Sequence, residues 1–352
     1  MRRTTKGGLN QDRHRHMCLE QELDRSVSIY QSLRMKALII VGLVSVLAWQ
    51  TDGVTRSSEL GAGIPPSSQT QKVRSRTRSD GPRPDGPYVT YYETGEKWAE
   101  GCYRNGKLEG PFTNWFKNGQ MMNQSVYVNG ERHGPFSSWH YNGTKREEGQ
   151  YRHGVKTGTW TKWDEQGRKK NAIEWQNGKR NGSATLWHDN GTVFKTGCFR
   201  DDKESGLWTT HDTDGVKLSA AVWRDGHLHG LAINWWKSGK KRSEGSYREG
   251  KKDGTWLEWD ENCVLRVVQD HREGTLHGRR TVWNSDGKRW REFVYTDGQL
   301  NGEFLDWHEN GELKSSGSYK DGYRDGRWLA WDDKGKLIKE DFYKMGDPVL
   351  PR

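Results

Sequence analysis

Histidine is the residue type in this chain best suited to bind a metal ion or to carry protons, and six of its twelve histidines form two regular sets. Multiples of 24 residues separate the members of each set, which are His140, His188 and His308, and His133, His229 and His277. If 24 residues form one unit of two strands, members of a set lie at least about 20 Å apart. Neither set can then share one metal ion.

The cysteines are equally far apart. Cys102 and Cys198 differ by four units of 24 residues, which predicts a separation of roughly 40 Å, and Cys263 falls in an expected turn. No intramolecular disulfide among these three is geometrically sensible. Cys18 precedes an apolar segment, so the cysteines do not indicate the redox compartment.

Acidic residues offer one candidate ion site. Asp212-Thr213-Asp214-Gly215 resembles part of a calcium loop, but it lacks the remaining ligands and the distal glutamate. Because Asp and Gly are common in turns, we expect an ordinary turn here.

Sequence motifs for catalysis are missing from the chain. It has no Gly-x-Ser-x-Gly elbow, Walker loop, Cys-x-x-Cys pair or His-Glu-x-x-His motif. The sharpest departures from the regular spacing are Asp202 with His211 and Cys263 with His271, which we interpret as drift in a tolerant array. The sequence therefore predicts a protein that is not an enzyme and holds no cofactor or metal.

Tryptophan has the most regular spacing of any large side chain. Four tryptophans share one position in the 24-residue period and nine share another; the four are Trp160, Trp208, Trp256 and Trp328, and the nine are Trp115, Trp139, Trp163, Trp187, Trp235, Trp259, Trp283, Trp307 and Trp331. The nine form our candidate binding surface, because indoles suit both protein partners and stacking on sugars. Cross-strand packing is the ordinary alternative.

Glycine sets the period itself. It recurs every 24 residues, eleven times without a slip, at Gly86, Gly110, Gly134, Gly158, Gly182, Gly206, Gly230, Gly254, Gly278, Gly302 and Gly326. We call each of these an anchor glycine, count it as position 0 and name its unit after it. An unbroken period means that each unit is one supersecondary element that docks on its neighbours.

Two further glycine positions predict the turns. Glycine occupies position +9 except at Cys263, and position +20 except at Asp202, and Asn often precedes it, as in Asn118-Gly119. Asn-Gly between aromatic and β-branched runs predicts a two-residue type I′ hairpin. The predicted fold is all-β: an elongated antiparallel β-hairpin repeat array of eleven units in one twisted sheet.

The turn length predicts which residues face each other across the strands. A two-residue turn at Asn118-Gly119, repeated in the next unit, predicts the pairs Phe112 with Ser125, Trp115 with Met122, Phe136 with Gly149, and Trp139 with Arg146. Tryptophan would then stack on cations at position +12, which are Arg146, Lys170, Arg242, Arg266 and Lys314. Positions +2 and +5 should point to opposite faces unless a bulge intervenes.

Several units match a known repeat pattern. The strings GPFTNWFKNG, GTWTKWDEQG, GEFLDWHENG and GRWLAWDDKG, each followed by a Gly-x-Tyr or similar step, resemble the MORN repeat in its bacterial variant, found in the YwqK-type antitoxin family. The resemblance covers Gly86 to about Val349. It implies a non-catalytic protein that works in scaffolding, membrane association, self-assembly or partner binding.

Residues 1–85 lack the repeat. Residues 1–34 are a basic extension, which an overextended gene start at Met1 rather than Met35 would explain. Residues 35–49 contain the apolar run ALIIVGLVSVLAW, which predicts a short helix acting as a signal peptide; an uncleaved N-terminal membrane anchor and a buried strand or helix are the alternatives. Residues 50–85 are rich in Ser, Pro and Arg and predict a disordered linker before the array of residues 86–349.

Charge limits the choice of partner. The net charge is +10, but residues 1–85 hold 14 Lys and Arg against 8 Asp and Glu, which leaves 43 against 39 in the rest. A nearly balanced array makes nucleic acid an unexpected partner. The basic linker suits an anionic membrane surface, with a plain solvated tether as the alternative.

These observations lead to three functional hypotheses. The first is a non-catalytic scaffold of the periplasm or cell envelope that binds a protein partner or envelope component. The second, carried by the family resemblance, is an antitoxin that neutralises a toxin by direct binding. The third is binding of an envelope glycan through exposed tryptophan, and unpaired terminal strands add end-to-end self-association as a further expectation.

Overall fold

A computed structural model describes residues 85–350, which belong to one of the chain's two compact units, Gln71–Arg352. The predicted segments 1–34 and 35–49 and nearly all of the linker 50–85 lie outside the described residues. The apolar run and its expected helix are therefore not part of the fold described below. Among the described residues, no helix is long and apolar enough to cross a membrane.

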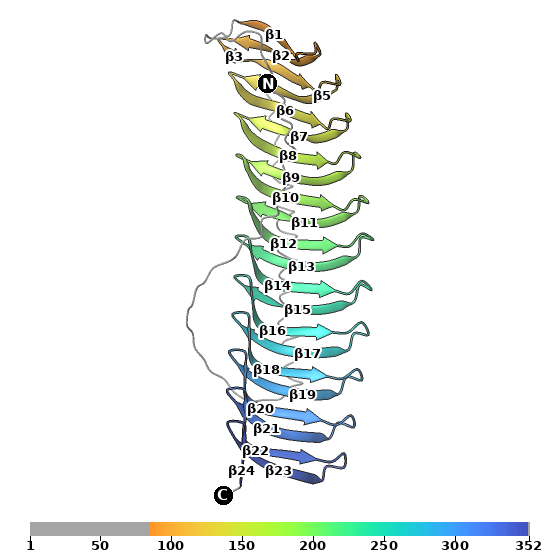
Figure 1. Cartoon of the computed structure of the whole chain (residues 1–352), viewed down its shortest axis with the longest axis vertical. Coiled ribbons are helices and arrows are strands. Elements are labelled where there is room, and N and C mark those ends of the chain that lie inside the picture. Colours follow the sequence, from red (N-terminus) through yellow and green to blue (C-terminus); the bar gives the residue numbers. More distant parts are fainter. Residues whose placement is uncertain (1–84, 351–352) are drawn as a thin grey trace, which may run out of the picture. The chain divides into compact units, whose positions relative to one another are not determined.

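The described residues form one antiparallel sheet, seen in Figure 1 as a ladder of strands. Each strand pairs with the next along the chain, and β3 and β4 together form what later units build as one strand. The strands are β1 Gly86–Tyr91, β2 Lys97–Arg104, β3 Lys107–Leu108, β4 Gly110–Trp115, β5 Met121–Val128, β6 Glu131–Trp139, β7 Lys145–Arg152, β8 Val155–Trp163, β9 Lys169–Gln176, β10 Lys179–Trp187, β11 Val193–Arg200, β12 Lys203–His211, β13 Lys217–Arg224, β14 His227–Trp235, β15 Lys241–Arg248, β16 Lys251–Trp259, β17 Leu265–Arg272, β18 Thr275–Trp283, β19 Arg289–Thr296, β20 Gln299–Trp307, β21 Leu313–Lys320, β22 Tyr323–Trp331, β23 Leu337–Lys344 and β24 Asp347–Val349. The predicted hairpin array is confirmed.

The turn at position +20 has the predicted two-residue form. Asn105 has φ 51° and Gly106 has φ 71°, so both central residues adopt the left-handed conformation that a type I′ turn requires. Asp202, which replaces the glycine once, takes the same conformation with φ 68°. Asp tolerates positive φ better than most residues, so the turn survives this exception.

The turn at position +9 differs from the prediction. Gly119 has φ 80°, whereas Asn118 does not have positive φ, and the Phe116 amide donates to the Gln120 carbonyl at 2.8 Å. The loop is therefore longer than two residues and has glycine in its left-handed position. The Asn118 carboxamide oxygen instead accepts from the Gln120 amide at 3.1 Å, an Asx-type contact.

The longer loop corrects the predicted register. Phe112 does lie opposite Ser125, and Phe136 opposite Gly149, as expected. A register shift next to the loop then places each +5 tryptophan opposite position +11 rather than +12; the observed pairs include Trp115 with Met121, Trp139 with Lys145 and Trp163 with Lys169. The predicted pairs Trp115 with Met122 and Trp139 with Arg146 are wrong by one residue.

The anchor glycine bends the strand. Gly158 has φ 64°, and the pairing of β7 with β8 jumps there from Glu148 opposite Thr161 to Gln150 opposite Thr157. Three residues of β8 thus face one residue of β7, which is an enlarged β-bulge. Positive φ at this position explains why glycine recurs there without a slip.

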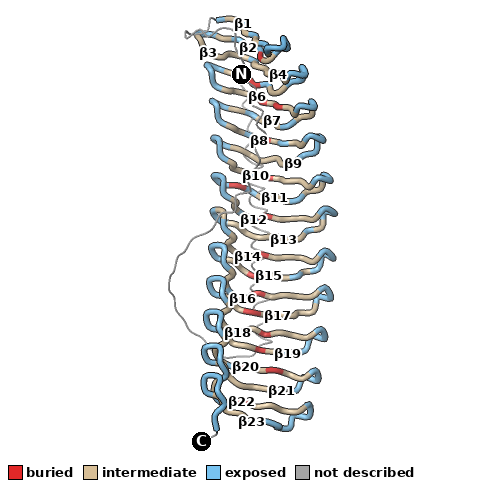
Figure 2. Tube along the Cα trace, in the orientation of Figure 1, coloured by how far each residue is buried: buried red, intermediate tan, exposed pale blue. Residues whose placement is uncertain are grey.

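The bend encloses the core of each unit. Trp160, two residues after the bend, is 2% exposed, and Lys156, two residues before it, places its Nζ 3.6 Å from the Trp160 ring centroid. The same lysine pairs with Glu147 at 3.0 Å. We call this side of the sheet the core face. Figure 2 draws the buried residues in red, and they recur along the array.

Candidate binding surface

The nine tryptophans at position +5 lie on the opposite side of the sheet from the core. Trp163 contacts Lys145, whose Nζ lies 5.6 Å from the ring centroid and 2.6 Å from Glu148. Glu148 follows Glu147 directly in β7, so the two side chains point to opposite faces. Since Glu147 belongs to the core face, Trp163 belongs to the other, which we call the outer face. Positions +2 and +5 therefore point to opposite faces, as expected.

All nine +5 tryptophans are half-buried and occupy equivalent places along the outer face. A cation at position +11 of the preceding unit covers six of them, at centroid distances of 5.0 to 5.9 Å; the pairs are Lys97 with Trp115, Lys145 with Trp163, Lys169 with Trp187, Lys217 with Trp235, Lys241 with Trp259, and Arg289 with Trp307. The expected stacking on cations at position +12 of the same unit is thus replaced by stacking between units. The other three tryptophans follow units with Met121, Leu265 or Leu313 at position +11.

Acidic residues complete this surface in several units. Lys97 pairs with Glu100 at 2.8 Å, and Lys241 pairs with Glu244 at 2.6 Å, repeating the arrangement of Lys145 and Glu148. The outer face therefore presents half-buried indoles beside alternating charges. The Lys97–Glu100 and Lys145–Glu148 pairs are about half exposed, so each contributes little to stability.

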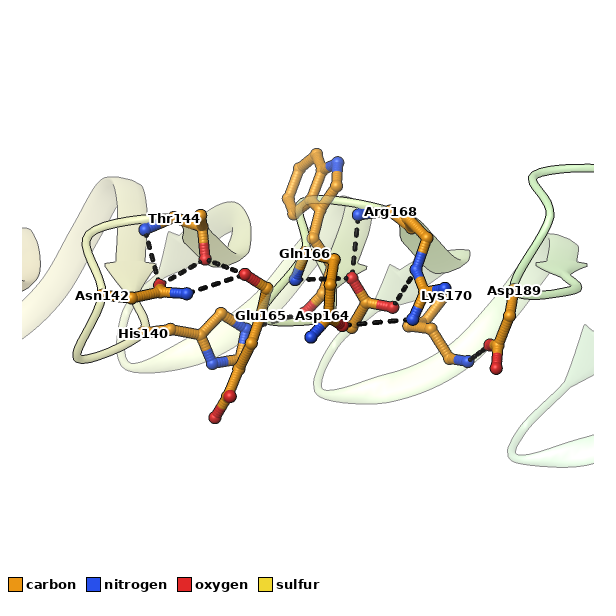
Figure 3. A network of polar contacts seen from close by, with 10 residues as sticks. His140, Asn142, Thr144, Asp164, Glu165, Gln166, Arg168, Lys170 and Asp189 are labelled. Atoms are coloured by element: carbon orange, nitrogen blue, oxygen red, sulfur yellow. Dashed lines mark hydrogen bonds and ion pairs between the residues drawn. The ribbon is translucent and has the colours of Figure 1, made fainter.

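The +9 turns tie neighbouring units together (Figure 3). The Asn142 side chain donates to the Glu165 carbonyl of the next unit at 2.8 Å, and the His140 Nε2 atom lies 3.0 Å from the Trp163 carbonyl oxygen. In that next unit Asp164 binds within its own turn, accepting from the Arg168 amide at 2.9 Å. These contacts hold the carbonyl of one +5 tryptophan and the loop after it.

Two kinds of unit alternate, which the sequence analysis missed. The Gly134 and Gly182 units have His at position +6 and Gly at +15, whereas the Gly158 and Gly206 units have Asp at +6 and Trp at +2. The sequence contains the evidence for this alternation, because two sets of residues recur every 48 residues, which is two units. One set is Gly101, Gly149, Gly197 and Gly245, and the other is Trp160, Trp208 and Trp256.

A close contact on the core face explains the alternation. A Cβ atom built on Gly149 would lie 2.3 Å from the Trp160 ring, and one on Gly197 would lie 2.1 Å from Trp208. No real Cβ atom approaches an atom this closely, so a tryptophan at +2 requires glycine at +15 of the preceding unit. The same holds for Trp256 above Gly245 and Trp328 above Gly317. We call this glycine and tryptophan a paired site.

The alternation fails once, between the Gly254 and Gly278 units. The Gly158 and Gly206 units, which also have Trp at +2, carry an apolar residue at +15 that faces alanine at the next +2, Ile173 with Ala184 and Ala221 with Ala232. Here Gln269 faces Arg280 instead, and the Gly278 unit then has Phe293 at +15 where glycine would stand. The Nε atom of Arg280 and the Nδ1 atom of His271 are buried without hydrogen-bond partners. Burial lowers the pKa of His271, and the nearby Lys252 adds to the effect. We call Gln269, His271 and Arg280 the interruption.

The remaining predicted features lie apart from one another. Asp212 accepts from the Asp214 and Val216 amides at 2.9 Å each, so the calcium-like string is an ordinary turn, as expected. Within residues 85–350, no group of three His, Cys, Asp or Glu side chains could hold a metal ion, and Cys102, Cys198 and Cys263 are free. The described array thus offers extended surfaces in place of a clustered chemical site.

Comparison with known proteins finds one family model that matches six segments of the array. The family model of the MORN repeat variant matches residues 84–105, 108–129, 132–153, 228–249, 300–321 and 324–345. The five units that the model does not match form the same paired strands. No curated protein matches the chain.

Three solved structures show distant likenesses. The chain is similar to TcdB2-TccC3 at 12% identity and a TM-score of 0.18, covering 72% of this chain and 15% of that one. It is similar to alternansucrase in complex with isomaltononaose at 14% identity and a TM-score of 0.19, covering 72% and 18%. A porin-like protein from Bacteroides uniformis is 9% identical with a TM-score of 0.16, covering 76% and 95%. The chain spans less than a fifth of the first two proteins.

Proposed function

We propose that this MORN-variant array is a non-catalytic scaffold that binds a protein partner along its outer face. The observation that carries the proposal is the repetition of nine half-buried +5 tryptophans on the face that the core does not use. Tryptophan is enriched where protein interfaces concentrate their binding energy, and charged rims set their orientation. Repetition along the array multiplies weak contacts into one stable attachment.

The core face is a poorer candidate for the same role. Its tryptophans Trp160, Trp208 and Trp256 are each 2% exposed, so they have almost no surface left for a partner. Their role is to hold consecutive units together. The two tryptophan positions thus divide the tasks of folding and binding.

We further propose that the scaffold works at the cell envelope, delivered by residues 35–49 as a signal peptide or N-terminal anchor. The support is the apolar run beside the basic residues Arg34 and Lys36. Fractionation of the full chain with a C-terminal tag, followed by N-terminal sequencing of the recovered protein, tests this proposal. Recovery of an intact chain in the cytosolic fraction alone would contradict it.

The binding proposal is tested by comparing variants of the full chain for capture of one identified protein. Replacement of Trp163, Trp187 and Trp235 by alanine should abolish capture in stoichiometric amounts. The matched control is Trp290→Ala, which removes a 45% exposed tryptophan outside the +5 set. Equal capture by the triple variant and the wild type would contradict binding by the outer face.

The identity of the captured protein separates this scaffold from the antitoxin alternative, since an antitoxin should neutralise the toxicity of its captured partner. Quenching of tryptophan fluorescence by envelope glycans, lost in the same triple variant, would instead favour the glycan alternative.

A further inference from the structure

The two ends of the array carry unpaired strand edges. Within residues 85–350, interior strands pair on both sides, whereas β1 pairs with β2 alone and β24 covers the last residues of β23. Lys339 and Glu340 of β23 pair with β22 on one side and have no strand on the other. An unpaired edge of this kind is a template for another strand.

Apolar side chains gather at these two ends. Of the fifteen large hydrophobic residues that the described array exposes, seven lie in β1 or after position 336; they are Val89, Tyr91, Leu337, Ile338, Met345, Val349 and Leu350. Within β1, the Thr90 hydroxyl is also buried without a hydrogen-bond partner. Among the described strands, each end of the array therefore has a full-length neighbour on one side alone.

We propose that β1 of one copy of this chain pairs with β23 of a second copy, in the register that joins interior units. In the interior, position +13 faces position +4 of the next unit, and +14 faces +3. The same register places Lys339 opposite Thr90, and Glu340 opposite Val89. The array then continues from one chain into the next.

Each facing pair at this junction has an interior counterpart. Lys195 faces Thr210 as Lys339 would face Thr90, and Glu244 faces Leu257 much as Glu340 would face Val89. The aromatic contacts continue too. Interior +17 rings meet the next +2 ring edge-on at 4.9 to 5.2 Å, as for Tyr151 with Trp160 and Tyr319 with Trp328, and the junction brings Tyr343 to Tyr88 in the same way.

The alternation of units is also preserved across the junction. The last unit, with Trp328 at +2, is of the second kind, and the first, with Gly101 at +15, is of the first kind. Because tryptophan at +2 requires glycine at +15 of the preceding unit, Asp341 at +15 of the last unit leaves no room for a tryptophan at +2 of the next. At the junction the next +2 residue is Tyr88 of the other copy.

One segment must move when the copies join. Asp85 of the first copy and Val349 of the second both fall at position −1 of the junction unit. We assign the displacement to β24, because its three residues are all exposed and hold only three register pairs with β23. The contact is head-to-tail, so it generates open chains of copies rather than a closed dimer.

Disulfide trapping in the full chain tests the register. After the four native cysteines are changed to serine, the double variant Thr90→Cys, Lys339→Cys should form a ladder of disulfide-linked oligomers on oxidation, because facing Cα atoms fall within bridging distance. The control Thr90→Cys, Glu340→Cys places the thiols on opposite faces and should crosslink much less. Equal crosslinking in the two variants overturns the register, and dimers of Thr90→Cys alone overturn the head-to-tail arrangement.

A charge swap tests association without oxidation. Val89→Glu sets two glutamates opposite each other at the junction and should weaken self-association about two- to fivefold in sedimentation velocity. Adding Glu340→Lys should restore it. Val155→Glu, at a similarly exposed interior valine, is the matched control and should leave association unchanged. A wild-type chain that stays monomeric at all concentrations overturns the proposal.

Discussion

The alternating units and the interruption differ by a few atoms on the core face. At the Gly197–Trp208 site a bare backbone accepts a ring, and Trp208 packs edge-on against Phe199 with centroids 5.1 Å apart. At the interruption Gln269 faces Arg280, whereas the equivalent boundaries pair Ile173 with Ala184 and Ala221 with Ala232 and carry no ring. The comparison shows that one unit restricts which residue the next unit can carry, so stability in this array depends on neighbouring units.

The largest effect should come from removing a paired-site ring. Trp160→Ala is expected to lower the free energy of unfolding by about 3–5 kcal/mol, because it empties a buried site. Urea unfolding of the full chain followed by circular dichroism measures the loss, and hydrogen exchange locates it in β7 to β9. A loss no larger than that of Trp163→Ala would remove the distinction between the two faces.

Adding a methyl group to the same kind of site should cost less. Gly197→Ala places a Cβ 2.1 Å from the Trp208 ring and is expected to destabilise by about 1–3 kcal/mol. The double variant with Trp208→Ala should lose less than the sum of the two single variants, because the clash then disappears. Additive losses in urea unfolding would show that the two residues are not coupled.

Building a paired site at the interruption tests whether the pairing can be transferred. Arg280→Trp alone should destabilise by about 1–3 kcal/mol, since the ring meets Gln269. Gln269→Gly with Arg280→Trp should recover that loss by creating a new paired site. The check is the urea midpoint of both variants; a double variant no more stable than Arg280→Trp would contradict the rule.

A smaller effect is expected on the outer face. Trp163→Ala should cost about 1–2 kcal/mol, because the side chain is only half-buried and its contact with Lys145 adds about 0.5–1 kcal/mol. Trp163→Phe is the matched control, because it keeps most of the apolar contact. If Trp163→Ala reduces capture of the protein partner by more than its small loss of stability explains, this tryptophan acts mainly in binding. An equal effect on capture and stability would contradict that role.

The smallest effect concerns pH. Burial lowers the pKa of His271 in the folded chain, so the unfolded chain takes up the proton first as pH falls through about 6.5. Stability should therefore decrease between about pH 6.5 and the lower folded pKa. His271→Gln should show a shallower decrease in urea midpoint over this window, whereas the exposed His227→Gln should follow the wild type. Parallel pH profiles for all three proteins would contradict the assignment.

Sequence reasoning succeeded where one residue type answers one backbone requirement. The turn at Asn105-Gly106 was predicted correctly because Asn and Gly both accept positive φ, and both residues have it in the structure. The same reasoning failed at Gly119, because Asn-Gly also fits a longer loop in which only the glycine has positive φ. The one-residue error at Trp115 followed from that turn. The nine outer-face tryptophans were found, but whether they bind a partner stays a prediction.

The repeat itself, the all-β class, the number of units and the separation of the histidines and cysteines follow from the sequence alone, because a 24-residue period allows no insertion. The tertiary structure decided which tryptophans are buried and which remain half-exposed, because only the bend at the anchor glycine brings position −2 over position +2. It also showed why the unit before each of Trp160, Trp208, Trp256 and Trp328 has glycine at position +15. The ring and the glycine are in contact across the boundary between two units, so the sequence of one unit does not show the constraint.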